Sequence, residues 1–210
     1  YGIRSLCGNI SRSLTMIVGI AVASMAVILA GVYQDAYDDM LDNKVPLAMM
    51  GGQYEYGFRD FQSENNYGGY GIMDVSFGVD GTDSMFNLIG YDEGCPLLTA
   101  ETISGASMEY GGFYMTSSAA RIFGVESGDE FTFYDLISME HTTITISDIV
   151  ENDVLSLMIT SKANVAQIIG RNAEGFNVII SEGPLNIPPE LLRKSASLED
   201  YRRSTESALN

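Results

Sequence analysis

The chain has 210 residues, of which 28 are acidic and 11 are basic, and its formal net charge is −17. This balance excludes the nucleic-acid-binding classes, because phosphate backbones are bound by clustered lysine and arginine. Apolar residues make up 46% of the chain, which is enough for a packed core and excludes wholesale disorder.

Charge divides the chain near residue 35. Residues 1–34 contain Arg4 and Arg12 and no acidic residue, which gives them a charge of +2. All 28 acidic residues and the other nine basic residues follow, so residues 35–210 carry −19. The chain starts with Tyr1 rather than Met, and we therefore expect it to be a piece of a longer protein.

Residues 14–32, LTMIVGIAVASMAVILAGV, form a 19-residue run without charge. As a helix this run is about 28 Å long, close to the hydrocarbon core of about 30 Å. A secretory signal peptide is the alternative, but its apolar region is usually about 7–15 residues and precedes a small-residue cleavage site. Residues 29–32 resemble a lipoprotein box, but Val32 stands where the lipidated cysteine is needed. We therefore predict a transmembrane helix in the lipid bilayer at residues 14–32.

The flanking charges predict the orientation of this helix. Arg4 and Arg12 precede the run, and the next basic residue is Lys44. The positive-inside rule then places residues 1–13 in the cytoplasm as a short flank and residues 33–210 outside the cytoplasm.

Residues 33–45 are predicted to continue the helix as a short stalk. Asp35, Asp38, Asp39 and Asp42 fall on one helical face. Four aspartates on one face make a poor metal cage, so we interpret them as a solvated face and predict no metal site. The proline after residue 45 is expected to end the stalk, because the residue before a proline disfavours helix.

Residues 46–196 are predicted to form an extracytoplasmic α+β domain of mixed short strands and helices. Residues 51–71 are rich in Gly and Tyr and are expected to be a loop. Strands are predicted at residues 74–78, 84–90, 113–116, 131–134, 142–150, 154–160 and 176–181. Helices are predicted at residues 117–123, 162–169, 187–194 and 198–209, and residues 197–210 are expected to lead toward a following membrane segment.

The clearest local signals surround the predicted helix at residues 117–123. Ser117 or Ser118 is expected to cap its start, and Gly124 is expected to end it. Asp129 is expected to hydrogen-bond the amides of the next turn. In the strand that follows, alternate phenylalanines are expected to face one side.

Residues 116–133, TSSAARIFGVESGDEFTF, and residues 147–152, SDIVEN, carry a resemblance to a known family. They resemble two phrases in the extracytoplasmic domain of FtsX-like permeases, the MacB-related family of ABC transporter membrane subunits. Residues 3–6, IRSL, with the apolar run after them, are similar to the family's lead into its first membrane helix. Asp148 stands where the family often has Gly.

This resemblance implies a permease, the membrane subunit of an ABC transporter, that is multi-pass in its full length. A separate ABC-type ATP-binding subunit would hydrolyse ATP in the cytoplasm, and a second permease chain or half would complete the complex. The outer domain would relay the motion to export or act on an extracytoplasmic substrate or partner. The matched phrases are structural, so the resemblance implies no catalytic, cofactor-binding or metal-binding residue, and the binding residues stay unknown.

Few residues suggest enzymatic chemistry, and we expect neither an enzyme nor a cofactor. His141 is the only histidine and is expected in a solvated turn, while Glu151 is interpreted as a turn residue at a strand end. Residues 69–71, GYG, are not followed by the third glycine of a nucleotide-binding loop. Cys7 and Cys95 would lie on opposite sides of the membrane, so no disulfide between them is expected.

Two other classes of protein would share these features. A membrane-anchored receptor with an extracytoplasmic ligand-sensing domain would also place an α+β domain after one membrane helix. An anchored, secreted binding domain would do the same. A permease should continue into further membrane helices after residue 210, whereas a receptor should continue into one return helix and a signalling module.

Overall fold

The computed structural model describes residues 10–39, 52–95, 102–153, 155–201 and 203. It divides into two compact units, Tyr1–Met40 and Leu41–Asn210. Several predictions lie outside the described residues: most of the cytoplasmic flank with Cys7, the end of the stalk with Asp42, and the last turns of the C-terminal helix.

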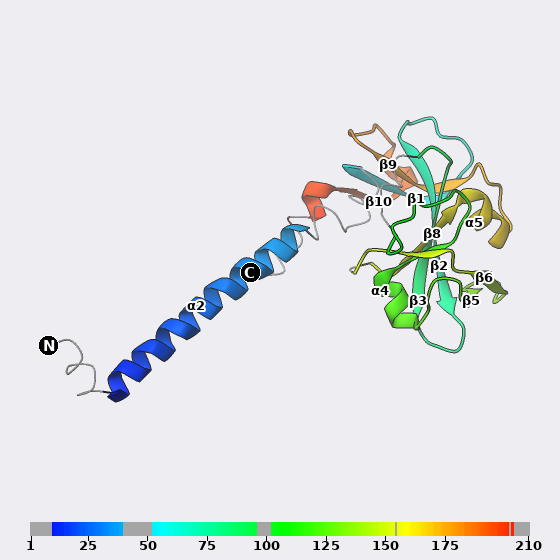
Figure 1. Cartoon of the computed structure of the whole chain (residues 1–210). Coiled ribbons are helices and arrows are strands. Elements are labelled where there is room, and N and C mark those ends of the chain that lie inside the picture. The colour runs from blue at the N-terminus through cyan, green and yellow to red at the C-terminus, as the bar shows by residue number, and fades with distance from the viewer. Residues whose placement is uncertain (1–9, 40–51, 96–101, 154, 202, 204–210) are drawn as a thin grey trace. The chain divides into compact units, whose positions relative to one another are not determined.

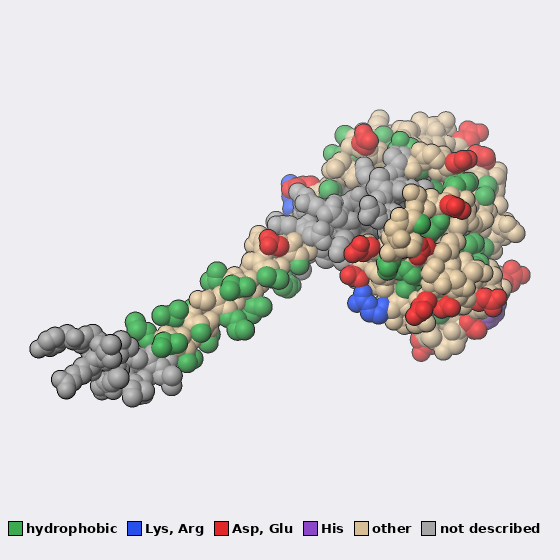
Figure 2. Space-filling view, viewed as in Figure 1, with side chains coloured by type: hydrophobic (Ala, Val, Ile, Leu, Met, Phe, Trp, Pro, Cys, Tyr) green, Lys and Arg blue, Asp and Glu red, His purple; other side chains and the backbone are tan. Residues whose placement is uncertain are grey.

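The first unit contains one long helix, α2 (Ile10–Asp39), drawn in blue in Figure 1. Its segment Thr15–Ala36 has 22 residues and a mean hydropathy of 2.4, so it is long and apolar enough to cross a membrane. The large aliphatic side chains of this segment are between 54% and 73% exposed, and Figure 2 shows them in green along the helix. A helix that is apolar all round is stable only inside protein or lipid, which supports the predicted membrane run.

The second unit is built on one mixed sheet, to which ten strands belong among the described residues. The order is β10-β1-β9-β2-β3-β8-β4-β7, and β5 pairs with β2 and β6 off this path. The strands are β1 (Tyr54–Gln62), β2 (Tyr70–Val79), β3 (Met85–Tyr91), β4 (Tyr114–Thr116), β5 (Glu130–Asp135), β6 (His141–Thr145), β7 (Asp148–Val150), β8 (Leu157–Ser161), β9 (Phe176–Ser181) and β10 (Leu192–Ser197).

Two parallel pairs, β3 with β8 and β4 with β7, lie among antiparallel neighbours. Short helices α4 (Ser117–Phe123) and α5 (Lys162–Ile168) follow β4 and β8 (Figure 1). Strands of both directions mixed with short helices make this an α+β domain, so the predicted fold class is confirmed.

Strand β2 joins the two halves of the sheet. Its residues 70–72 pair with β9, residues 73–78 pair with β3, and residues 77–79 also pair with β5. Ten residues at about 3.3 Å each make a strand of about 33 Å. The two ends of β2 therefore serve different neighbours, which is why a single strand can bind both halves together.

The largest apolar cluster of the core contains interlocking phenylalanines. The ring of Phe77 lies 5.0 Å from that of Phe133, and the ring of Phe86 lies 5.6 Å from Phe131 and 5.4 Å from Phe133, all edge to face. Aromatic pairs prefer this geometry and gain about 0.5–1.5 kcal/mol beyond their burial. Phe131 and Phe133 both face the core, which confirms the predicted alternation in β5.

Helix α5 lies very close to the sheet at Gly90 of β3. A Cβ atom at this position would lie 2.7 Å from Cγ2 of Val165 and 3.0 Å from Cα of Lys162. Val165 is fully buried. Only a residue without a side chain allows the helix to approach this strand so closely.

Most strands and helices with local signals match the structure. The predicted strand at residues 176–181 coincides with β9, and the predicted helices at residues 117–123 and 162–169 coincide with α4 and α5 to within one residue. Residues 198–201 and 203 are helical, as predicted for the start of the C-terminal helix.

The predicted loop at residues 51–71 is wrong, because it contains β1 and the start of β2. Strand β1 pairs with β9 on one side and with β10 on the other. Hydrogen bonds to two neighbours outweigh the low strand preference of its glycine. These partners lie more than 100 positions away in the chain.

The predicted helix at residues 187–194 is also wrong. A short 3-10 turn, η2 (Pro189–Leu191), is followed directly by strand β10. Proline lacks the amide hydrogen that a helix interior needs, and the residues after it gain pairing with β1 instead.

The predicted single strand at residues 142–150 is divided into β6 and β7. Ile146 exchanges backbone hydrogen bonds with the turn at residues 128–129 instead of continuing along β5, and the amide of Ser147 donates to the carbonyl of Phe113 at 2.7 Å. The chain changes partner at this point, so its apolar alternation spans two strands.

Candidate functional site

The first of the two motif phrases forms the end of β4, helix α4 and the turn after it. Thr116 caps α4, because its Oγ1 accepts a hydrogen bond from the amide of Ala119 at 3.4 Å. The prediction of Ser117 or Ser118 as the cap is therefore wrong by one position. The Thr116 hydroxyl also donates to the carbonyl oxygen of Leu155 at 2.5 Å, which ties the helix start to the segment just after the second phrase.

The turn after α4 follows the sequence prediction closely. Gly124 ends the helix in the left-handed conformation, with φ 67° and ψ 39°. Gly128 also has a positive φ of 89°. The Asp129 carboxylate accepts a hydrogen bond from the amide of Glu126 at 2.8 Å. The predicted helix stop and the predicted turn contact are both confirmed.

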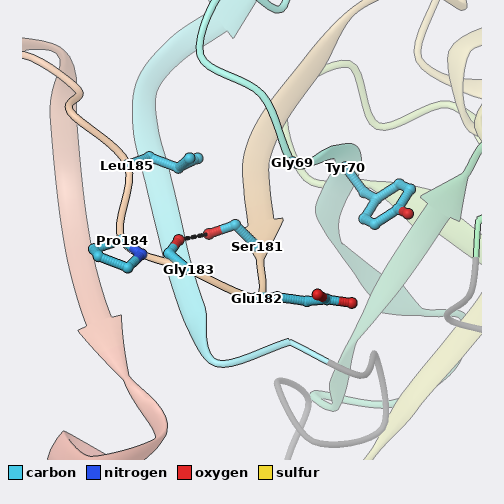
Figure 3. A pocket seen from close by; sticks show the side chains of 7 residues that line it. All are labelled: Gly69, Tyr70, Ser181, Glu182, Gly183, Pro184 and Leu185. Atoms are coloured by element: carbon cyan, nitrogen blue, oxygen red, sulfur yellow. Dashed lines mark hydrogen bonds between the residues drawn. The ribbon is translucent and has the colours of Figure 1, made fainter.

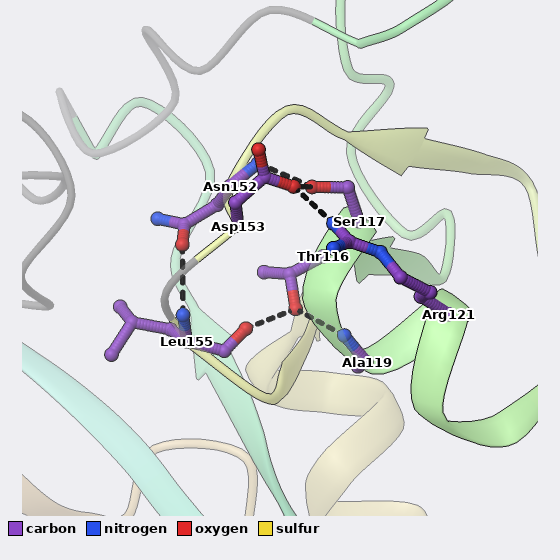
Figure 4. Close-up of polar contacts among 7 residues, drawn as sticks. All are labelled: Thr116, Ser117, Ala119, Arg121, Asn152, Asp153 and Leu155. Carbon is purple, nitrogen blue, oxygen red and sulfur yellow. Dashed lines mark hydrogen bonds and ion pairs between the residues drawn. The ribbon is translucent and has the colours of Figure 1, made fainter.

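The second phrase lies beside the first because β7 pairs in parallel with β4. Its register joins Tyr114 to Asp148 and Thr116 to Val150. The side chain of Asn152 is only 1% exposed, and its Oδ1 accepts a hydrogen bond from the amide of Leu155 at 2.9 Å. Two segments about 30 residues apart thus form one structural unit, shown in Figure 4.

The two serines at the start of α4 bind the second phrase rather than their own helix. The Ser117 hydroxyl accepts from the amide of Asn152 at 3.0 Å and donates to Asp153 Oδ1 at 2.9 Å, and the amide of Ser118 donates to the carbonyl of Asn152 at 3.0 Å. Arg121 on α4 binds the same Asp153 oxygen at 2.5 Å (Figure 4). This ion pair is exposed, so we expect it to add at most about 1 kcal/mol.

A groove of about 580 Å³ lies where the two phrases meet. It is lined by Ile103, Ser104, Ser117, Ala120, Arg121, Gly124, Val125, Glu126, Ser127, Asp148 and Ile149. At its edge, burial alone would raise the pKa of Asp148, but hydrogen bonds from Ser104 and from the amide of Ile149 outweigh it and lower that pKa. These contacts make the groove a candidate binding surface of aliphatic and small polar groups.

A second cavity of about 480 Å³ lies at the end of β9. Its lining includes Tyr70, Glu182 and Leu185, shown with four further residues in Figure 3. The Ser181 hydroxyl donates to the carbonyl of Gly183 at 2.7 Å and shapes its wall. Gly69, which opens the GYG stretch, approaches the backbone of β9 so closely that a Cβ would lie 2.6 Å from the Ile180 oxygen. The stretch is therefore a packing contact of the sheet.

The residues considered for catalysis do not come together. His141 is the first residue of β6 rather than a turn residue, and its half-exposed ring lies 3.6 Å from the Asp80 carboxylate. Glu151 is exposed just after β7, in the predicted strand-end position. Cys95 is a buried thiol. The described residues contain no cluster of three or more metal-ligating side chains.

Sequence reasoning missed two ionic groups. Lys162, at the first turn of α5, is buried and binds Asp92 at 2.8 Å. Glu55 on β1, Lys194 on β10 and Tyr201 in the C-terminal helix form the second group. The second group could not be seen in the sequence, because Glu55 lay in a predicted loop and Lys194 in a predicted helix.

No protein-family model and no curated protein sequence matches the chain. Among solved structures, it is similar to the extracellular domain of the noncanonic ABC-type transporter YknZ from Gram-positive bacteria. That match has a TM-score of 0.39 and 12% sequence identity, and it covers 60% of this chain and 67% of that chain. A likeness at this level carries no argument about the function of the chain.

Proposed function

We propose that the chain is the first membrane helix and outer domain of an FtsX-like, MacB-related ABC transporter permease. Helix α2 crosses the membrane with its N-terminal end in the cytoplasm, and the acidic α+β domain lies outside. The outer domain relays motion driven by a cytoplasmic ATP-binding subunit to an extracytoplasmic substrate or partner. A second permease chain or half completes the complex.

The observation that carries this proposal is the parallel pairing of β4 with β7. It places the two phrases that resemble the permease family in one unit. They are joined by the pairing of Thr116 with Val150 and by the hydrogen bond between Ser117 and Asn152. Two short phrases that matched the family only by chance would have no reason to lie side by side in the fold. Their contacts are structural, which fits a domain that transmits movement rather than one that catalyses a reaction.

The charge division and α2 support the same proposal. The candidate span Thr15–Ala36 follows a short basic flank and precedes the acidic domain. Basic residues are retained on the cytoplasmic side of membrane helices. A receptor with a sensing domain shares this arrangement, so the discriminating property is the partner in the cytoplasm.

The test is purification of the full-length protein from its native membranes in mild detergent, through an affinity tag. We expect an ABC-type ATP-binding subunit to copurify in a fixed ratio, and the complex to hydrolyse ATP. An unrelated tagged membrane protein from the same cells is the control. Purification without such a subunit, or with a signalling module in the same polypeptide, contradicts the proposal.

A further inference from the structure

We propose that Glu55, Lys194 and Tyr201 form a latch that fixes the C-terminal helix, described at residues 198–201 and 203, to the edge of the sheet. The latch makes strand β1, near the start of the domain, and the C-terminal helix, at its end, move as one body. Its use in transmitting motion rests on the proposed function, but its existence does not.

The three side chains come from three neighbouring elements at one edge of the sheet. Glu55 lies on β1, Lys194 lies on the neighbouring strand β10, and Tyr201 lies in the helix that follows β10. Lys194 Nζ lies 3.2 Å from both carboxylate oxygens of Glu55 and 2.5 Å from the Tyr201 hydroxyl. The Tyr201 hydroxyl donates to Glu55 Oε2 at 2.8 Å. Each member therefore binds both others in a closed triangle.

Burial makes this triangle stronger than an ordinary surface ion pair. The Glu55 side chain is only 14% exposed, and a carboxylate removed from water is costly unless donors satisfy it. Burial alone would lower the pKa of Lys194, but the hydrogen bond to Tyr201 and the charge of Glu55 outweigh it and raise that pKa.

Backbone contacts bring the entering and leaving segments together beside the latch. Tyr54 of β1 pairs with Ser197, the last residue of β10. The amide of Leu198 donates to the carbonyl of Gln53 at 3.0 Å. The Ser197 hydroxyl in turn accepts from the amide of Asp200 at 3.1 Å and caps the helix start.

The helix is also anchored to the apolar core. Leu198 and Tyr201 pack against the cluster that contains Ile72, Val178 and Ile180. Tyr201 thus serves twice, with its ring on the core and its hydroxyl in the latch. A pull on residues 198–203 is therefore passed to β1 and β10 directly, rather than being absorbed by unwinding of the helix.

Hydrogen–deuterium exchange on the full chain in detergent tests the latch. Tyr201→Phe keeps the ring and removes the hydroxyl, and Glu55→Gln keeps the shape and removes the charge. We expect both variants to raise exchange at residues 198–201 by about tenfold or more, because each breaks a hydrogen bond to a charged group. Exchange in α5 should stay within about twofold of the unaltered protein.

The matched control is Arg203→Gln, which breaks the exposed ion pair between Arg203 and Glu199 on the same helix. We expect it to change exchange less than about twofold. The double variant Glu55→Gln with Lys194→Met should raise the exchange rate at residues 198–201 by less than the product of the two single increases. Both single variants remove the same interaction, so their effects should not be independent.

Two results would overturn the latch. One is exchange at residues 198–201 that matches the unaltered protein in both variants. The other is an equal rise across α5 and the whole sheet, because that would make the three residues part of general stability. The measurement needs no ATP-binding subunit, so the latch and the proposed function can fail independently.

Discussion

Asp74 places a carboxyl group inside the sheet without full compensation. Its Oδ1 is buried and has no hydrogen-bond partner. Its backbone is held separately, because the Asn177 side chain accepts from the Asp74 amide at 2.8 Å and donates to the Asp74 carbonyl at 2.7 Å. Burial, and then the nearby charge of Glu55, raise the pKa of Asp74 above 3.8. The ionised side chain therefore costs stability at neutral pH.

We expect Asp74→Asn to raise the melting temperature at pH 7. The raised pKa means that the folded protein binds this proton more tightly than the unfolded chain does. The penalty from Asp74 therefore grows as the pH rises through the unfolded pKa and is complete above the folded pKa. The gain should shrink as the pH falls and vanish below the unfolded pKa of about 3.8. Near-ultraviolet circular dichroism of the 12 tyrosines can follow unfolding of the full chain in detergent.

Asp83→Asn is the matched control for Asp74, because it removes one charge from an exposed turn of the same acidic domain. It should change the melting temperature little at any pH. An equal rise in both variants would mean that net charge, rather than burial of Asp74, limits stability.

At the scale of elements, the α4 turn shows what local sequence can determine. The helix stop at Gly124 and the turn contact of Asp129 follow from residue types that tolerate positive φ or bind nearby amides. The capping residue was missed by one position, because Thr116 and Ser117 can both cap a helix. The tertiary contact of Ser117 with Asn152 and Asp153 decides between them.

Strands β1 and β10 show where sequence prediction stops. Both strands depend on partners far away in the chain. Strand β1 alternates aromatic residues at Tyr54, Tyr56 and Phe58, but the many glycines around it favoured a loop prediction. Strand β10 has no apolar alternation. The latch lies across these two strands, so it could not be predicted from the sequence without them. The groove could be predicted only in part. The sequence showed its two phrases, but it did not show that β4 and β7 pair in parallel.

We expect Gly124→Ala to lower the free energy of unfolding by about 1–2 kcal/mol, since any side chain is strained in the left-handed region. A Cβ at this position meets nothing within 4 Å, so the cost is purely conformational. Gly183 is also open to a Cβ and has no positive φ, and Gly183→Ala should leave stability unchanged or slightly raised. Urea unfolding of both variants in detergent measures the difference, and equal effects would rule out this explanation.

At the scale of the whole molecule, the net charge of −17 is the sum of +2 in residues 1–34 and −19 in residues 35–210. Along the sequence, the basic residues precede the apolar segment of α2 and the acidic domain follows it. Figure 2 shows acidic side chains distributed over the visible face of the domain. A domain of this charge is well suited to remain soluble outside the membrane. The orientation of α2 is thus the claim on which the permease proposal depends.

Thiol labelling in intact cells tests this orientation most directly. Ile137 is 94% exposed at the turn between β5 and β6, so a cysteine there should react with a membrane-impermeant maleimide when Cys7 is replaced by serine. Cys7 in the unaltered chain should react only after the cells are permeabilised. Labelling of Cys7 in intact cells, with Ile137→Cys protected, would contradict the account.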